Sequence, residues 1–225
     1  MHIPDGYLSP QTYLPLYGVF IAATAIAVKK VEKKIDKKTV PFLGMAAAFS
    51  FLIMMFNVPI PGGSTGHAVG GAIIALIFGP WVSFISVSVA LIIQAFVFGD
   101  GGITAIGANC INMALIMPFA AWATFKLIAG KSESVARLNV AAFVAGYVSL
   151  NIAALVTAVE FGIQPLIAQG ADGNPLYAPY PLKVAVPTMV LEHLIFGIIE
   201  GLVTLLIFKY FYKNQPQMIT AIHKK

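Results

Sequence analysis

The sequence alternates between long apolar runs and short connections in which glycine, proline or charged residues gather. Seven apolar segments can be delimited in this way, at 13–28, 41–57, 67–79, 81–98, 105–128, 138–165 and 185–208. A helix needs about 20 mostly apolar residues to cross a bilayer, so most of these segments are long enough and little chain is left between them. The pattern predicts an all-α integral membrane protein with about seven transmembrane helices.

The composition excludes a water-soluble domain. Hydrophobic residues make up 59% of the chain and charged residues 10%, against about 45–50% and about 25% in soluble domains. We therefore expect a single transmembrane domain over residues 1–225, with no separate catalytic domain. The formal net charge is +5, but the cations cluster in particular connections, which is typical of membrane orientation and not of nucleic-acid binding. Cys110 is the single cysteine, so no disulfide can form within the chain.

The distribution of Lys and Arg predicts the orientation of the chain. The connection 29–38 carries six lysines, and the positive-inside rule assigns it to the cytoplasm. Alternation then places the other cations on the cytoplasmic side as well, except Lys183, if 67–79 and 81–98 are counted as two spans. The N-terminus is expected outside and the C-terminus in the cytoplasm.

The start of the chain and the third segment are unusual. The start, MHIPDGYLSP, lacks the basic and apolar regions of a cleavable signal. Because His2 is bulky, we expect Met1 to remain as the mature terminus. The third segment is short and follows the irregular stretch PIPGGSTG, whose backbone at membrane depth needs protein or a water-filled cavity to satisfy its polar groups.

Three residues predicted on the outer side could bind a metal ion. The amine of Met1, the backbone nitrogen of His2 and the Nδ1 atom of His2 can close two chelate rings on one ion, and His67 can supply a fourth nitrogen. Four nitrogens in a plane suit Ni(II) or Cu(II), whereas Zn(II) favours a tetrahedron. Reduced copper prefers sulfur, so we rank Ni(II) first and Co(II) second.

The histidines also have ordinary structural interpretations that involve no metal. A histidine at position 2 is ordinary, and a lone histidine at a helix start is usually a cap or a hydrogen-bonded core residue. Polar residues near the predicted outer end could form a second shell or gate around the metal. They are Asp5, Ser64, Thr65, Asp100, Asn109, Asn112 and Glu160.

Two other classes of function compete with metal capture. Ionisable residues in apolar spans, here Glu160, Glu192, His193 and Glu200, could form the path of a secondary proton- or cation-coupled transporter or channel, or could be neutral or paired within the bundle. The stretch GGSTG around Ser64 matches a nucleophile elbow, so an intramembrane hydrolase that uses Ser64 is the second alternative. Such an elbow requires a strand entering a helix together with a distant acid and base, and nothing in the sequence predicts a strand here. The stretch GKS at 130–132 lacks the earlier glycine of a phosphate-binding loop, so ATP hydrolysis would need a partner.

Three stretches resemble the CbiM/NikM family, the substrate-capture M components of nickel and cobalt energy-coupling-factor transporters. They are MHIPDGYLSP, PIPGGSTGHAVGG and FGDGGITAIGANCINM. The resemblance implies an additional N-terminal segment and helix over 1–40, a six-helix S-component core over 41–210 and a cytoplasmic tail over 211–225. It also implies that the terminal segment folds back into the bundle, and that Met1, His2 and His67 hold the metal.

The resemblance further implies partners and a location. The chain would be a subunit, not an enzyme, of an ATP-driven importer in the prokaryotic cell (inner) membrane. A transmembrane coupling subunit, two ABC-type ATPases and a small accessory membrane subunit would complete it. The transported ion would be Ni(II) or Co(II), with no cofactor. Gly44 and Ala48, or else Ala23 and Ala27, have the spacing of small residues used for helix docking, although either pair could serve internal packing.

Overall fold

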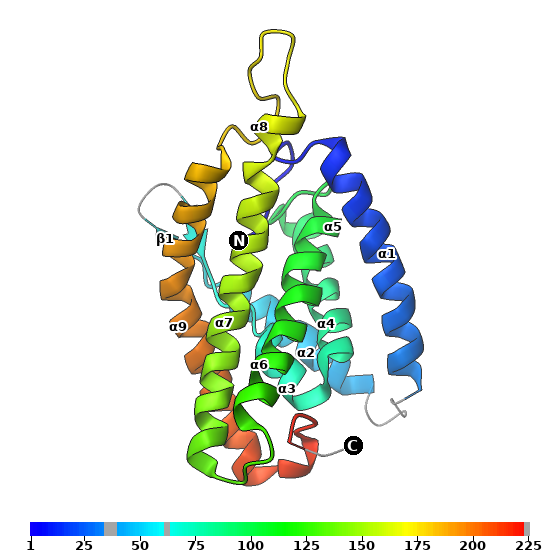
Figure 1. The fold of residues 1–225 in the computed structure, drawn as a ribbon. Helices are drawn as coiled ribbons and strands as arrows, with labels where there is room; N and C mark the ends of the chain where they lie inside the picture. Colours follow the sequence, from blue (N-terminus) through cyan, green and yellow to red (C-terminus); the bar gives the residue numbers. More distant parts are fainter. Residues whose placement is uncertain (34–39, 61–63, 223–225) are drawn as a thin grey trace.

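The computed structural model describes residues 1–33, 40–60 and 64–222; of residues 60, 64 and 65 it describes the backbone alone. The chain forms an elongated helical bundle, with the terminal segment 1–9 entering it from one end (Figure 1). The main helices are α1 (Pro10–Glu32), α2 (Val40–Met54), α3 (Gly71–Phe78), α4 (Pro80–Ile93), α5 (Ile106–Asn109), α6 (Met117–Ala129), α7 (Val135–Gly162), α8 (Gln164–Ile167) and α9 (Leu182–Asn214). The π-helical turns η1 (Gln94–Phe98) and η2 (Cys110–Ile116) extend α4 and join α5 to α6, and a short 3₁₀ turn, η3 (Pro216–Met218), follows α9.

The predicted fold class is confirmed. Each of the seven apolar segments contains a helix, and five helical stretches are long and apolar enough to cross a membrane. These stretches are Pro10–Glu32, Pro80–Phe98, Ile106–Ala129, Val135–Ile167 and Leu182–Asn214. Helix α2 is a shorter apolar helix. Proline occupies the first turn of α1 and α4, where its missing N–H would have no partner in the helix.

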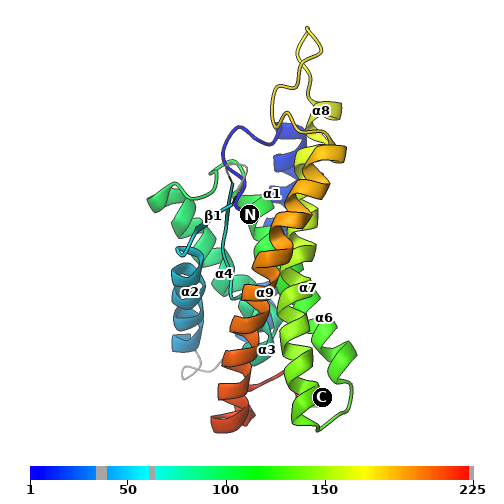
Figure 2. The ribbon, with the colours of Figure 1, turned by 90° about the vertical axis from the view of Figure 1, so that its left-hand side faces the viewer.

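The third segment differs from the predicted transmembrane helix. Helix α3 has eight residues, a length of about 12 Å, which is far short of a bilayer core. The chain reaches it through the antiparallel pair β1 (Val58–Ile60) and β2 (Ser64–Gly66) and a non-helical stretch up to Gly70. Both views place this pair beside α9 (Figures 1 and 2). Glycine and proline between 59 and 71 prevent an earlier helix start, because they disfavour helical backbone.

Both ends of α3 are satisfied inside the protein. At its N-terminus, the Glu200 carboxylate accepts hydrogen bonds from the backbone N–H groups of Val69, at 2.8 Å, and Gly70, at 3.0 Å. At its C-terminus, Thr220 and Ala221 donate their N–H groups to the carbonyls of Ile77 and Leu76. The requirement that protein satisfy this irregular backbone is therefore met by α9 and by the tail.

Small residues allow α7 and α9 to pack closely. A Cβ at Gly146 of α7 would lie 2.8 Å from the Glu200 carbonyl, and one at Gly201 of α9 would lie 2.9 Å from the Phe143 carbonyl. Helices in a bilayer associate through such close contacts, since burial from water provides no drive there. This close packing of α7 against α9 fixes the position along the bundle at which Glu200 contacts the backbone just before α3.

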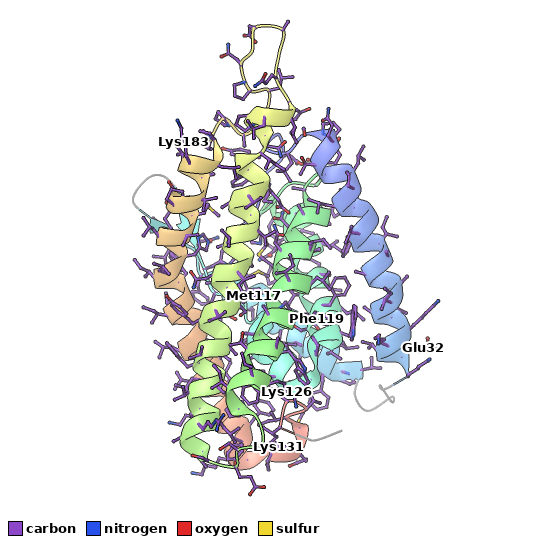
Figure 3. All side chains as sticks on the ribbon, viewed as in Figure 1. Glu32, Met117, Phe119, Lys126, Lys131 and Lys183 are labelled. Carbon is purple, nitrogen blue, oxygen red and sulfur yellow. The ribbon has the colours of Figure 1, made fainter. Side chains whose placement is uncertain are left out.

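Charged residues mark the two ends of the bundle. Lys126 and Lys131 lie at one end and Lys183 lies near the other, which agrees with the predicted segregation of cations (Figure 3). Lys34, Lys37, Lys38, Lys224 and Lys225 fall outside the described residues. Which end faces the cytoplasm stays a prediction.

Candidate metal centre

The terminal segment folds back into the bundle and is held there through its backbone. Asn109 accepts a hydrogen bond from the N–H of Ile3 at 2.8 Å and donates its amide to the carbonyl of Ile3 at 3.1 Å. Gly102 donates its N–H to the same carbonyl at 2.8 Å. Met1, Ile3, Leu8 and Ser9 are all buried. Asn109 was predicted near the outer start of its span, and it contacts the backbone that follows His2.

A second contact fixes the turn that follows Ile3. The exposed Asp5 carboxylate accepts hydrogen bonds from the N–H groups of Ile103 and Thr104 and from the Thr104 hydroxyl. The hydroxyl bond contributes most to lowering the pKa of Asp5. A Cβ at Gly102 would lie 2.4 Å from the Asp5 nitrogen, so only glycine allows the two segments to approach so closely.

Gln164 makes a third contact, which the sequence did not reveal. Its side-chain oxygen accepts the N–H of Ser9 at 2.9 Å, and its amide donates to the Thr12 hydroxyl at 3.0 Å. The side chain is buried. A lone glutamine beside Pro165 in an apolar segment gives no signal of its partner, because that partner is 155 residues away.

The histidine rings predicted to bind metal lie together. The rings of His2 and His67 are stacked, with centroids 4.8 Å apart and an interplanar angle of 26°. His67 is 3% exposed, and its Nδ1 donates to the Ala68 carbonyl at 3.0 Å. Its Nε2 is buried and makes no hydrogen bond among the described residues. A ligating histidine commonly has this arrangement, in which a carbonyl fixes Nδ1–H and leaves the Nε2 lone pair free.

Burial keeps the nitrogen donors neutral. It lowers the pKa of the Met1 amine from 8.0 to about 6, against the opposing charges of Asp100 and Glu192. Burial also holds the pKa of His67 well below its usual value, and the charges of the amine, of His2 and of His193 lower it further. Neutral nitrogens are what a transition metal requires, because protonated ones cannot donate a lone pair.

The orientation of His2 differs from that expected in a chelate. Its Nδ1 atom, the predicted ligand, lies 3.0 Å from Oδ1 of Asp100, while its Nε2 is buried without a hydrogen-bond partner among the described residues. A chelate through Nδ1 therefore requires the bond to Asp100 to be replaced. No group of three His, Cys, Asp or Glu side chains that could hold a metal occurs within residues 1–33, 40–60 and 64–222, so a site here needs backbone or terminal nitrogens.

Other predicted residues lie elsewhere in the described chain. Asn112 donates to Glu160 at 2.7 Å and to Thr157 at 3.0 Å, forming a separate buried polar group with these two residues. Ser64 and Thr65 form strand β2 through their backbone, and their side chains are outside the described part. Gly44 and Ala48 lie on the exposed face of α2.

The residues of the rival ion path have different partners. Glu200 binds the α3 loop, Glu160 binds Asn112, and His193 donates to the Met189 carbonyl within its own helix. These contacts fit the alternative in which each residue is paired within the bundle. They do not link the three side chains into one hydrogen-bonded chain.

Comparison with known proteins identifies the family. The sequence profile of CbiM, described as the cobalt uptake substrate-specific transmembrane region, matches residues 2–218. The chain belongs to this family. The resemblance based on three sequence motifs is thereby confirmed, and the description of the family refers to metal uptake.

Relatives carry names that refer to metal transport. The chain is 48% identical over 221 residues to the fused nickel transport protein NikMN of Rhodobacter capsulatus, with 97% of this chain and 64% of the relative covered. It is 46% identical to the probable fused nickel transport protein LarMN of Lactiplantibacillus plantarum, over 96% of this chain and 66% of that protein. The chain thus spans slightly less than two thirds of these fused relatives.

Two further matches cover nearly the whole of both chains. The chain is 44% identical to a putative metal transport protein of Methanocaldococcus jannaschii, over 98% of this chain and 96% of the relative. A crystal structure of a transition metal transporter superimposes with a TM-score of 0.90 at 48% identity, covering 95% of this chain and 93% of that one. The fold of this chain therefore also occurs in a solved structure of a transition metal transporter.

Proposed function

We propose that the protein captures a divalent transition metal ion, Ni(II) in preference to Co(II), as the substrate-specificity subunit of an ATP-driven importer. The ligands are the amine of Met1, the backbone nitrogen and Nδ1 of His2, and Nε2 of His67. The observation that carries the proposal is the burial of the Met1 terminus beside these two neutral imidazoles. The nickel transport names of the relatives that are 46–48% identical support the choice of metal.

The chemistry of the donors favours Ni(II). The amine and backbone nitrogen close a five-membered ring, the backbone nitrogen and Nδ1 close a six-membered ring, and His67 completes a plane of four nitrogens. Planar nitrogen coordination suits Ni(II). Binding releases protons from the backbone amide and from any protonated amine, so affinity rises with pH. Asp100, which faces His2, would give up its hydrogen bond and stay as a nearby negative charge.

The terminal segment acts as both ligand and closure. Because two of its residues supply three donors, the ion cannot be enclosed until the segment docks on Asn109, Gly102 and Gln164. Release requires the same contacts to break. In this proposal residues 1–40 are an addition to a six-helix core at 41–210, followed by a tail at 211–225.

Partners supply the energy for transport. A transmembrane coupling subunit, two ABC-type ATPases and a small accessory membrane subunit in the prokaryotic cell membrane would complete the importer. Gly44 and Ala48 are exposed on α2, where small side chains leave room for a partner helix. The proposed orientation has the N-terminus outside, so that the metal enters from there.

The test compares the native terminus with an extended one. Three residues, Gly-Ser-Gly, are placed before Met1; one added residue would be unsuitable, since an amine two residues before a histidine forms a new four-nitrogen chelate. Intact mass first checks that Met1 is the mature terminus. We expect the native protein to bind one Ni(II) with a yellow, square-planar spectrum, and the extended protein to lose that spectrum. Equal yellow complexes in both proteins would contradict the ligand set.

Reconstitution of the purified protein into proteoliposomes tests the rival ion path. A secondary transporter or channel would take up metal or protons in proteoliposomes that contain this chain alone. The capture subunit should bind metal there without sustained uptake. ATP-independent accumulation of Ni(II) would favour the rival.

A further inference from the structure

His193 on α9 is a buried histidine with a free ring nitrogen. The side chain is 1% exposed, and its Nδ1 donates to the Met189 carbonyl at 2.8 Å. Its Nε2 is buried and has no hydrogen-bond partner among the described residues. Leaving such a buried acceptor unpaired is unfavourable, so the free nitrogen calls for an explanation. His67 has the same arrangement, with Nδ1 bound to a carbonyl and Nε2 free.

The packing of α9 places His193 on the helix face that contacts the stretch around His67. Three residues further along the helix, the Phe196 ring fills the space beside Gly66, where a Cβ would lie 2.2 Å from the ring. The His193 and Phe196 rings are 6.3 Å apart, which fits neighbours on one helix face. One turn further on, Glu200 binds the backbone of Val69 and Gly70. The stretch that carries His67 therefore runs directly along the face of α9 that bears His193.

Two neighbouring residues of α9 carry buried polar atoms without a hydrogen-bond partner among the described residues. They are Nε2 of His193 and Oε2 of Glu192. An ion that reaches this face of α9 would meet a free imidazole and a carboxylate oxygen.

We propose that His193 is a second-stage metal ligand, which holds the ion through Nε2 together with Nε2 of His67 when the terminal segment withdraws. The inference rests on the proposed function, because it concerns the same ion after the donors of Met1 and His2 have left. Two imidazoles and water give a weaker, six-coordinate complex in place of the planar one. The ion then leaves its tight site by exchanging ligands one after another, without passing through a bare state.

The position of His193 along α9 is consistent with a route inward. Glu200 and Thr204 follow at seven and eleven residues, spacings that lie on the same helix face, and both are fully buried. Helix α9 runs from the end with Lys183 to the end where Lys126 and Lys131 lie. His193 is the part of this buried polar stripe nearest to the terminal segment.

The experiment isolates the second-stage complex. The background protein carries the Gly-Ser-Gly extension with His2→Gln and His223→Gln, which leaves His67 and His193 as its only histidines. Ni(II) or Co(II) content is measured by equilibrium dialysis, and coordination by absorption. We expect one bound ion with a weak, six-coordinate spectrum, and loss of that ion when His193→Gln is added.

Controls separate this result from misfolding and from failure of the proposed function. The matched control is Thr204→Val on the same buried face, which should retain the ion in the extended background. With the native terminus, His193→Gln should keep the yellow Ni(II) complex; absence of that complex in the unmutated native protein would refute the proposed function itself. A background protein that binds no ion, or one that binds equally without His193, would overturn the inference.

Counting the histidine ligands by spectroscopy avoids the His193→Gln substitution. Paramagnetic Co(II) shifts the exchangeable Nδ1 protons of its histidine ligands, and these protons are retained here by hydrogen bonds to Ala68 and Met189. The background protein should show two such signals. A single signal would exclude His193 as a ligand.

Discussion

The two arms of the candidate centre are anchored in opposite ways. The arm that bears His67 is embedded in the bundle, and a buried carboxylate, Glu200, fixes its backbone. The arm that bears Met1 and His2 is a free chain end, held by side-chain amides at Asn109 and Gln164 and by an exposed carboxylate at Asp5. The difference indicates one fixed ligand arm and one that can be withdrawn at modest free-energy cost.

Disrupting the fixed arm should have the largest effect. Glu200→Ala leaves two buried N–H groups without their acceptor at the start of α3 and opens a cavity. We expect a loss of about 3 kcal/mol in the free energy of unfolding, measured by denaturation in detergent, together with weakened Ni(II) binding. Thr204→Val, one turn away, is the control and should change stability much less. An unchanged unfolding curve for Glu200→Ala would show that the carboxylate does not anchor this arm.

Acidification should have the second-largest effect, and it should act on the terminal arm. Because burial lowers the pKa of the Met1 amine from 8.0 to about 6, docking is fully favoured above pH 8 and weakens as pH falls towards 6, by roughly 2–3 kcal/mol in all. Release of the amide proton adds to this dependence. Ni(II) affinity, measured by chelator competition, should fall at least roughly 100-fold from pH 8 to pH 6. A flat profile would rule out the amine and amide as ligands.

Asn109→Leu should weaken the terminal arm while leaving the bundle intact. It removes both side-chain hydrogen bonds to Ile3, worth about 1–2 kcal/mol together, which corresponds to about a tenfold loss of Ni(II) affinity. Amide hydrogen exchange in residues 2–9 should accelerate. Asn112→Leu is the matched control: it disturbs Glu160 and Thr157, so it should lower stability but change affinity less than about threefold. Equal affinity losses in both variants would contradict the distinction.

Asp5→Ala should have the smallest effect. Its carboxylate is exposed, so water replaces the lost bonds to Ile103 and Thr104, and we expect less than about a threefold loss of Ni(II) affinity. The loss should be the same at pH 6 and pH 8, because the pKa of Asp5 is lowered and its carboxylate stays ionised throughout that range. Titration calorimetry of both proteins at two pH values checks this; a loss as large as that of Asn109→Leu would mean that the turn, and not Ile3, controls docking.

Much of the fold could be predicted because apolar length is a local property. The segments 81–98, 105–128, 138–165 and 185–208 correspond to long helices. The segment 67–79 was predicted to be a transmembrane helix, and most of its residues are apolar. Gly70 with a φ of 73° and the distant carboxylate of Glu200 restrict the helix to eight residues, and hydropathy does not measure either influence.

Only part of the candidate site could be predicted, because local chemistry can be inferred from the sequence and contacts between distant residues cannot. Met1, His2 and His67 could be grouped because the chemistry of the first two is local and topology put the third on their side. Gln164 could not be found, since its partner Ser9 lies 155 residues away. The bond between His2 and Asp100 was also not foreseen, although Asp100 was among the expected surrounding residues.

The sequence alone determined the class of the protein, its apolar segments, the separation of charge between the ends and the donor types available to a metal. These depend on composition and on spacing over a few residues, so they can be read without coordinates. Tertiary structure decided which carboxylate supports the α3 loop, which amides hold the free terminus and which imidazole nitrogens stay unpaired. Those outcomes depend on contacts between distant helices, whose close packing is set by small residues such as Gly146 and Gly201.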